Sequence, residues 1–369
     1  MAKRLLLLGG GHTHLGVLER LTAEPMRDCE VTLLSAYPRQ IYSGMLPGWV
    51  AGHYTIDECS VSLVDLAARA GVAFHRGTVV RLDLEEHVAV AADGESFGFD
   101  VLSIDTGSEP AILGLSGAKD HALPIRPIEA FISAWPGVVA DWTDKTSAFE
   151  LVIVGGGAAA IELAFAARQR AWSEGATHVR VTLVSREAIP LAGFQPAAVK
   201  RTVRLLRKLG IAWRGDSGVA EIQAGRLLLE DDRIVPFDAC LLATGAAAPT
   251  WPRRAGLATD EGGFVRVDAT LQSVSHPRVF AAGDVAALPE PRPKSGVFAV
   301  RASPALGHNL YAALAQGKPC EWQPQKRALY LLSTGDGRAI AVWGSWSAMG
   351  RWVWRWKDRI DRRFVARFR

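Results

Sequence analysis

The sequence is poor in cysteine and has no long hydrophobic run. It contains only four cysteines, and no two of them form a CxxC or CxxxxC pair: Cys29, Cys59, Cys240 and Cys320. We therefore expect no disulfide framework, no dithiol made from neighbouring cysteines and no metal site. No stretch approaches the ~20 apolar residues of a membrane-spanning helix, and the apolar start at residues 5–8 is too short for a secretory signal. These absences predict a cytoplasmic protein.

Most of the chain carries no excess of positive charge. The formal net charge is +4, but residues 350–369 alone contain seven arginines and one lysine against two aspartates. The rest of the chain is therefore slightly acidic, and we expect no nucleic-acid partner. With 49% apolar and 22% charged residues, the composition is that of a globular protein, and 369 residues predict about two or three domains with hydrophobic cores.

Two segments, residues 3–34 and 151–184, follow one plan. Each reads as a strand, a glycine-rich turn, a helix and a second strand, which is a βαβ unit. Each is followed by short strands that end in a Thr-Gly turn, at Thr106-Gly107 and at Thr244-Gly245. One such unit would be weak evidence, but the repetition predicts two nucleotide-binding domains.

The first glycine turn contains Gly9-x-Gly11. The first glycine permits a tight turn, and the second lets the backbone approach a pyrophosphate on the helix N-terminus. His14 replaces the third glycine, and Ser35 stands where an acidic residue would hold a ribose. His12 lies beside the pyrophosphate or caps the helix. Taken alone, the motif fits a dinucleotide site and an ordinary βα turn equally well.

The second glycine turn, Gly155-x-Gly157-x-x-Ala160, is closer to the full dinucleotide-binding pattern. Its second strand ends in Ser185-Arg186 instead of an acid. An acid favours NAD through the ribose 2′-hydroxyl, whereas a serine and an arginine suit a 2′-phosphate and hence NADP. The alternative is that Arg186 is simply solvated.

Three further residues are candidates for the chemistry. Glu162, in the first turn of the second unit's helix, either favours the helix dipole or faces the cofactor cleft. Asp284, after Gly283 at the end of a strand, accepts hydrogen bonds from ribityl or ribose hydroxyls, or caps a helix. Lys294 either places a positive charge near a reduced flavin or lies on the surface.

The C-terminal segment predicts a basic amphipathic helix. Its large apolar residues fall at helical spacing on one face, among arginines and lysine: Trp352, Val353, Trp356, Ile360, Phe364 and Phe368. A basic helix with tryptophan can lie on an anionic membrane surface, which would make the protein peripheral on the inner face of the membrane. Alternatively, the helix docks on its own subunit or across a homodimer.

Taken together, the two glycine motifs, the two Thr-Gly turns and the late Gly-Asp resemble the two-dinucleotide-binding-domain flavoprotein superfamily. This superfamily includes pyridine nucleotide–disulfide oxidoreductases and type II NADH dehydrogenases, and the resemblance covers about residues 3–320. Within it, residues 38–48, 294–301 and 354–358 resemble a narrower group. That group is the NADH-dehydrogenase-like flavoproteins found alone or fused ahead of selenide, water dikinase.

The resemblance implies an α/β fold with two Rossmann-like three-layer domains and a small C-terminal α+β segment. The FAD-binding domain would be discontinuous, with residues 1–115 and 246–320. The NAD(P)-binding domain would span 116–245, and 321–369 would form the C-terminal segment with the basic helix.

The resemblance also implies FAD and NAD(P)H as cofactors. The residues implied for FAD are Gly9, Gly11, His12, Ser35, Arg39, Ser43, Gly44, Met45, Thr106, Gly107, Gly283 and Asp284. Those implied for the nicotinamide nucleotide are Gly155, Gly157, Ser185, Arg186, Thr244 and Gly245. Glu162 would lie near the nicotinamide, and Glu162 and Lys294 are the predicted catalytic residues.

The leading hypothesis is an FAD-dependent oxidoreductase that passes hydride from NAD(P)H to FAD and electrons on to a quinone-like acceptor, without a redox-active CxxxxC pair. A second hypothesis is oxidation of a sulfur or selenium compound, which requires a cysteine near the flavin, with Cys59 and Cys320 as candidates. A third is a non-catalytic FAD-binding partner module in selenium metabolism.

Overall fold

The computed structural model describes residues 2–112 and 114–369. A five-stranded parallel sheet in the order β21-β9-β1-β2-β5 forms one half of the molecule. Its strands come from both ends of the chain: β1 (Lys3–Leu8), β2 (Cys29–Ser35), β5 (Ala73–Arg76), β9 (Val101–Ile104) and β21 (Val279–Ala281). Central parallel strands are buried on both faces, and accordingly all four leucines of residues 5–8 are at most 1% exposed.

Three helices pack around this sheet: α1 (His12–Ala23), α3 (Leu63–Arg69) and the long α9 (Gly296–Ala315). A three-stranded meander connects β5 to β9: β6 (Val79–Asp83), β7 (Val88–Ala91) and β8 (Ser96–Gly98). A segment of short elements leads from β2 to α3: β3 (Arg39–Ile41), the 3-10 turn Ser43–Met45, α2 (Leu46–Val50), the 3-10 turn Asp57–Cys59 and β4 (Ser60–Ser62).

A second five-stranded parallel sheet repeats the plan in the order β11-β18-β12-β13-β14. Its strands are β11 (Leu123–Pro124), β12 (Phe149–Val154), β13 (Val179–Val184), β14 (Ala212–Arg214) and β18 (Ala239–Leu242). Its helices are α5 (Ile128–Asp144), α6 (Ala158–Ser173) and α7 (Pro196–Lys208), and its meander is β15 (Val219–Gln223), β16 (Arg226–Leu229) and β17 (Ile234–Pro236). The predicted fold of two Rossmann-like domains is confirmed.

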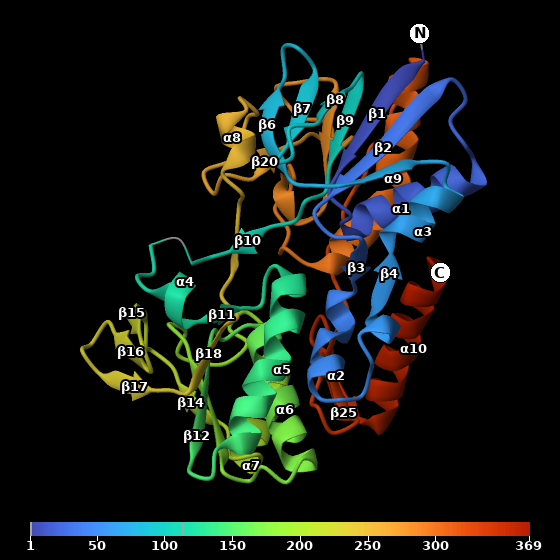
Figure 1. Cartoon of the computed structure of the whole chain (residues 1–369). Coiled ribbons are helices and arrows are strands. Elements are labelled where there is room, and N and C mark those ends of the chain that lie inside the picture. The colour runs from blue at the N-terminus through green and yellow to red at the C-terminus, as the bar shows by residue number, and fades with distance from the viewer. Residues whose placement is uncertain (1, 113) are drawn as a thin grey trace.

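Two chain crossings join the halves, and they pair with each other as β10 (Glu109–Pro110) and β19 (Ala246–Ala247). Figure 1 shows the first sheet in the upper half, the second sheet in the lower half and β10 between them. The short helix α4 (Ala118–His121) follows the first crossing, and α8 (Trp251–Arg254) follows the second, before β20 (Val265–Arg266) and β22 (Ala286–Ala287).

The C-terminal segment forms an antiparallel sheet, β23 (Tyr330–Ser333), β24 (Ala339–Trp343) and β25 (Trp346–Gly350), followed by α10 (Arg351–Arg367). Figure 1 shows α10 beside β4 and α2, on the outside of the molecule. No helix in the described part of the chain is both long enough and apolar enough to span a bilayer.

The buried face of α10 differs from the predicted one. Its most buried residues include Val353, Lys357, Asp361 and Val365, whereas Trp352, Trp356 and Ile360 are 53%, 39% and 41% exposed. Two charged residues can be buried here because they pair with each other: Lys357 Nζ lies 2.6 Å from Asp361 Oδ2. The helix therefore docks on its own subunit and presents tryptophans on its outer side.

Candidate functional site

The first glycine turn packs tightly against residue 105, at the end of β9. Gly9 has φ +87°, a conformation that favours glycine, and a Cβ atom there would collide with the backbone of Asp105. A Cβ atom on Gly11 would collide with the Asp105 carboxyl group, and one on Gly283 would collide with its Oδ1. Three glycines of the predicted FAD motifs therefore also make room for one aspartate that the sequence reasoning missed.

Asp105 caps the N-terminus of α1. Its carboxylate accepts hydrogen bonds from the backbone N–H of Thr13 (2.8 Å) and of His14 (2.9 Å), and its backbone carbonyl accepts one from Gly11 (3.2 Å). The residue is 3% exposed. Burial raises the pKa of this carboxyl to about 7, with a smaller contribution from the negative charge of Asp284.

His14 shows why the third glycine of the first motif is not needed. That glycine normally allows the helix to pack closely on the strand. Here the imidazole is fully buried between them, with Nδ1 2.6 Å from the carbonyl oxygen of Gly9 and Nε2 2.8 Å from Ser103 Oγ. Burial lowers the pKa of His14 to about 4, so the ring is neutral and its space is provided by the small Ser103 side chain.

Aromatic rings converge on the same turn. His12 lies 5.6 Å from Tyr42 and 5.9 Å from Phe364, and the latter two rings are 4.4 Å apart between centroids. The His12 Nε2 atom is buried and has no protein partner among the described residues. Burial lowers the pKa of His12 to about 4. Phe364 belongs to α10, so the C-terminal helix completes this site, which no local sequence signal indicated.

The predicted ribityl residue Asp284 is held by the first crossing. Arg126 Nη1 lies 3.2 Å from Asp284 Oδ2, and Ser108 Oγ lies 3.5 Å from the same oxygen. Arg126 also donates to Ser108 Oγ. Arg126 thus brings a guanidinium to the site from a loop between the two halves. No local motif in the sequence indicated this role for Arg126.

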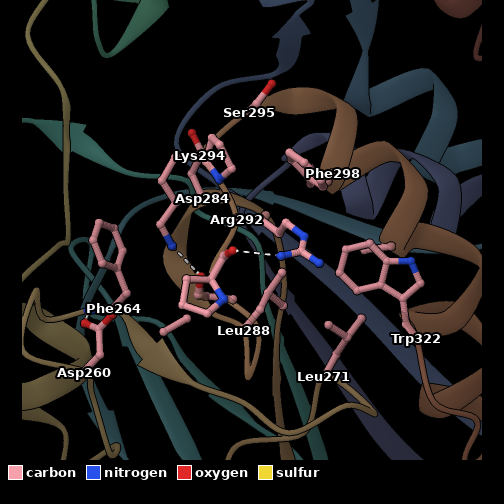
Figure 2. Close-up of a pocket in the computed structure, with 17 residues that line it drawn as sticks. Asp260, Phe264, Leu271, Asp284, Leu288, Arg292, Lys294, Ser295, Phe298 and Trp322 are labelled. Atoms are coloured by element: carbon pink, nitrogen blue, oxygen red, sulfur yellow. Dashed lines mark hydrogen bonds between the residues drawn. The ribbon is translucent and has the colours of Figure 1, made fainter. Parts of the chain in front are cut away.

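Lys294 lines a cavity of about 170 Å³ beside the Gly283-Asp284 turn. Figure 2 shows its side chain directed back into the protein, where Nζ donates to the carbonyl oxygen of Ala286 at 2.5 Å. The ammonium group also lies 3.8 Å from the centroid of the Phe264 ring, and desolvation lowers the pKa of Lys294. The side chain is thus neither on the surface nor free, and its predicted role near the flavin stays a prediction.

The loop after β2 carries the other residues implied for FAD. Ser35 is buried at the end of β2, Ser43 is exposed, and Met45 is fully buried. The Gly44 carbonyl accepts a hydrogen bond from Lys357 Nζ at 2.6 Å. Arg39 points elsewhere, because its guanidinium makes a bidentate pair with Glu129 of α5, at 3.0 and 3.2 Å.

The second glycine turn is more open than the first. Gly155 has φ +139°, and a Cβ atom there would collide with the carbonyl of Ala243, whereas a Cβ atom on Gly157 would meet nothing within 4 Å. Ala243 follows β18 in the same way as Asp105 follows β9, since both residues precede a Thr-Gly turn and both donate their N–H to the first β-strand of their unit. At this turn Thr244 Oγ1 is buried without a protein partner among the described residues.

At the end of β13, Ser185 is buried and Arg186 is exposed. Arg186 Nη2 makes an ion pair with Glu230 Oε1 at 2.5 Å. Glu230 comes from the turn between β16 and β17. The arginine predicted to read a 2′-phosphate therefore already has an acidic partner.

The Thr106-Gly107 turn of the first half lies at the edge of the site, with Thr106 exposed and Gly107 at φ +76°.

Glu162 faces the C-terminal segment. Its Oε1 accepts a hydrogen bond from the backbone N–H of Ser333 at 2.7 Å. Burial raises the pKa of Glu162 to about 7, while the nearby Lys357 ammonium acts in the opposite direction. Asp361, which pairs with Lys357, also interacts with the hydroxyl group of Tyr42. A buried polar network thus links the second unit, α10 and the loop of the first half.

Of the two cysteines that are candidates for a sulfur or selenium reaction, Cys59 is disfavoured by its surroundings. All four are free. Cys59 is fully buried, and desolvation raises the pKa of its thiol to about 12. Cys240 is also buried, while Cys29 and Cys320 are partly exposed. The thiolate that a sulfur or selenium reaction needs is disfavoured at Cys59.

The two turns fit the cofactors that the resemblance implies. Each offers a helix N-terminus at the end of a parallel strand, where phosphates bind, and each leaves a buried polar atom without a protein partner: His12 Nε2 at the first and Thr244 Oγ1 at the second. The first turn also has Asp284 for hydroxyl groups and an aromatic wall for a flat ring system.

Comparison with known proteins agrees with this architecture. The sequence model of the pyridine nucleotide-disulphide oxidoreductase family matches residues 3–303. The demethylphylloquinone reductase NdbB of Synechocystis is 26% identical over 371 residues, which cover 94% of this chain and 90% of that protein.

Two solved structures have the same fold. The sulfide:quinone oxidoreductase of Aquifex aeolicus superposes with a TM-score of 0.84 at 19% identity, covering 100% of this chain and 92% of that one. NDH2 of Plasmodium falciparum, solved in complex with NADH, superposes with a TM-score of 0.81 at 12% identity, covering 100% and 98%. At these identities the likeness concerns the fold alone.

Proposed function

The chain belongs to the pyridine nucleotide-disulphide oxidoreductase family and is an NADH-dehydrogenase-like oxidoreductase with FAD and NAD(P)H as cofactors; on this premise we propose that it transfers electrons from NAD(P)H through FAD to a quinone. The observation that carries the proposal is the composition of the first site. Aromatic rings line it, and the thiol of Cys59, which lies in the same loop region, is held in its protonated form. The similarity to a demethylphylloquinone reductase supports the same acceptor class.

Electrons therefore pass to the acceptor directly. FAD supplies the redox chemistry when bound, and the chain orients it and excludes water. In our proposal the N-terminus of α1 and Asp284 hold its phosphates and hydroxyls, and Tyr42 and Phe364 wall off the site. The turn before α6 holds the nicotinamide nucleotide.

We propose that Glu162 accepts and releases a proton during reduction of the quinone. Reduction of a quinone to its hydroquinone takes up two electrons and two protons. NAD(P)H supplies both electrons and one proton, so a second proton must come from the medium. A carboxyl group with a pKa of about 7 can accept and release a proton near neutral pH at its Oε atoms. Glu162 fits this task better than an ordinary surface glutamate.

The test is an anaerobic titration of the purified holoprotein with NADPH and then NADH, followed by a water-soluble short-chain quinone. We expect the flavin absorbance to bleach with one or both nucleotides and to return on addition of the quinone. Bleaching without return would overturn the quinone acceptor. No bleaching by either nucleotide would instead favour the non-catalytic module or oxidation of a sulfur or selenium compound.

We further propose that the outer face of α10 contacts an anionic membrane surface, where a lipid quinone would be held. Trp352, Trp356 and Ile360 are exposed there among Arg351, Arg355 and Arg359, a combination that favours interfacial binding. Full-length protein should float with vesicles containing anionic lipid, and a double variant with Trp352→Ser and Trp356→Ser should float less. Equal flotation of the two proteins would contradict this contact.

A further inference from the structure

The N-terminus of α1 has almost no free hydrogen-bond donor. A helix leaves its first four N–H groups without intrahelical partners, and here these belong to Gly11, His12, Thr13 and His14. Asp105 accepts from three of the four, through its backbone carbonyl and its carboxylate. The carboxylate also occupies the positive end of the helix dipole, where an anion is stabilised.

The second site lacks this arrangement. Ala243 stands where Asp105 stands in the first site, and the described residues place no carboxylate on the first N–H groups of α6. The two sites otherwise share the strand, the glycine turn and the packing of the first glycine on the residue before Thr-Gly. The difference is therefore one buried acidic side chain at one of two similar phosphate sites.

We propose that the pyrophosphate of FAD and the Asp105 carboxylate compete for the N-terminus of α1, so that the protein takes up one proton on Asp105 when it binds FAD. Two anions at one helix N-terminus repel each other in a buried place, and protonating the carboxyl removes that repulsion. A neutral carboxyl also frees the helix dipole for the phosphates. The proposal rests on the family's FAD cofactor and is independent of the acceptor.

The other ionisable groups around Asp105 are less suited to take up this proton from the medium. His12 and His14, on α1, have pKa values lowered to about 4 by burial, so before FAD binds they are neutral between pH 6 and 9 and need a larger rise in pKa than Asp105 to become protonated. Asp284 adds negative charge and is paired with Arg126. Lys294 interacts with Asp284 from the segment before α9. Asp105 itself has a pKa of about 7 without the cofactor, so above that pH it must gain a proton.

The test measures FAD binding, not turnover. Full-length apoprotein is titrated with FAD by flavin fluorescence from pH 6 to 9, and proton uptake is followed with an indicator dye in weakly buffered solution. For one coupled proton, the dissociation constant should rise towards tenfold per pH unit above about pH 7. At pH 8 we expect close to one proton taken up per FAD bound.

Two variants sharpen the test. Asp105→Asn keeps the shape of the side chain but cannot ionise, and Asp105→Ala installs the residue of the second site. Both should bind FAD with a flat pH dependence and without proton uptake. Binding of NADH to the second site, measured in the same proteins, is the matched control and should not take up a proton in any of them.

The proposal is overturned if the wild-type protein binds FAD without proton uptake, or if Asp105→Asn retains the uptake. Should a variant fail to fold, the wild-type measurement alone decides whether a proton is taken up, and the remaining variant decides whether Asp105 carries it. Because no quinone is present, failure of the acceptor proposal leaves these results unchanged.

Discussion

The two glycine turns have the same local structure, yet the neighbouring side chains pack on them differently. Around the first, side chains pack closely on the turn: Asp105 lies under the glycines, His14 lies between helix and strand, and Phe364 covers His12. Around the second, Gly157 has open space and Ala243 replaces the acid. A tightly enclosed turn suits a cofactor that stays bound, and an open one suits a nucleotide that must leave after each turnover.

The largest expected effect separates the two turns directly. Gly11→Ala places a methyl group against the Asp105 carboxyl, and overpacking of this kind costs about 1–3 kcal/mol. We expect the variant to lose most of its FAD on gel filtration and to unfold at a lower temperature. Gly157→Ala, the matched change, should retain FAD and thermal stability. Equal losses in the two variants would show that the packing at Asp105 does not distinguish the turns.

A second comparison concerns pH. Glu162 and Asp105 both have raised pKa values in the folded protein, so between about pH 4.5 and 7 the folded state binds more protons than the unfolded state. The free energy of unfolding must therefore fall as pH rises through this window and level off above it. For Glu162 the fall amounts to at most about 3 kcal/mol. Chemical denaturation at pH 5 and pH 7.5 should show a smaller difference for Glu162→Gln than for wild type. An unchanged difference would argue against a protonated Glu162.

A single substitution on α10 tests whether this helix encloses the first site. Phe364→Ala takes away a half-buried ring from His12 and Tyr42. We expect the free energy of unfolding to fall by about 1–2 kcal/mol and FAD to dissociate faster. The release of FAD is followed by flavin fluorescence. Trp356→Ala changes an exposed ring on the same helix and serves as the control. FAD release at wild-type rate from Phe364→Ala would mean that α10 does not enclose the first site.

The smallest expected effect concerns nucleotide choice at the second turn. Glu230 pairs with Arg186 at the surface, and such exposed pairs contribute only about 0–1 kcal/mol. Glu230→Gln should free Arg186 for a 2′-phosphate and lower the KM for NADPH up to about fivefold, with little change for NADH. Arg186→Ala should not show this gain. If both variants behave alike, Arg186 does not read the phosphate.

Local patterns in the sequence were sufficient to predict the part of the architecture that occurs twice, the two parallel sheets with their glycine turns. Glycines after apolar strands predict βα turns, and two copies of one pattern predict two sheets, as found. The start of α9 is less accessible to such patterns: the helix begins at Gly296 and contains Pro304, although a proline is more common in the first turn of a helix than in its interior.

Contacts between segments that are distant in the sequence could not be predicted from local patterns. Asp105 lies in an unremarkable Ile-Asp-Thr-Gly stretch, Arg126 lies in a loop, and Phe364 lies some 350 residues after the ring it covers. The amphipathic pattern of α10 also misled, since the buried stripe includes Lys357 and Asp361. A pattern of apolar spacing cannot anticipate that two opposite charges one turn apart will be buried as a pair.

The contact between Phe364 and His12 has a consequence for the order of events during synthesis. A ribosome makes the chain from the N-terminus at roughly 5–20 residues per second, so His12 emerges tens of seconds before the ring that covers it. The second sheet, by contrast, is complete once β18 has been made. The nascent protein is therefore expected to acquire its nicotinamide-nucleotide fold first and to retain flavin only after α10 has emerged from the ribosome.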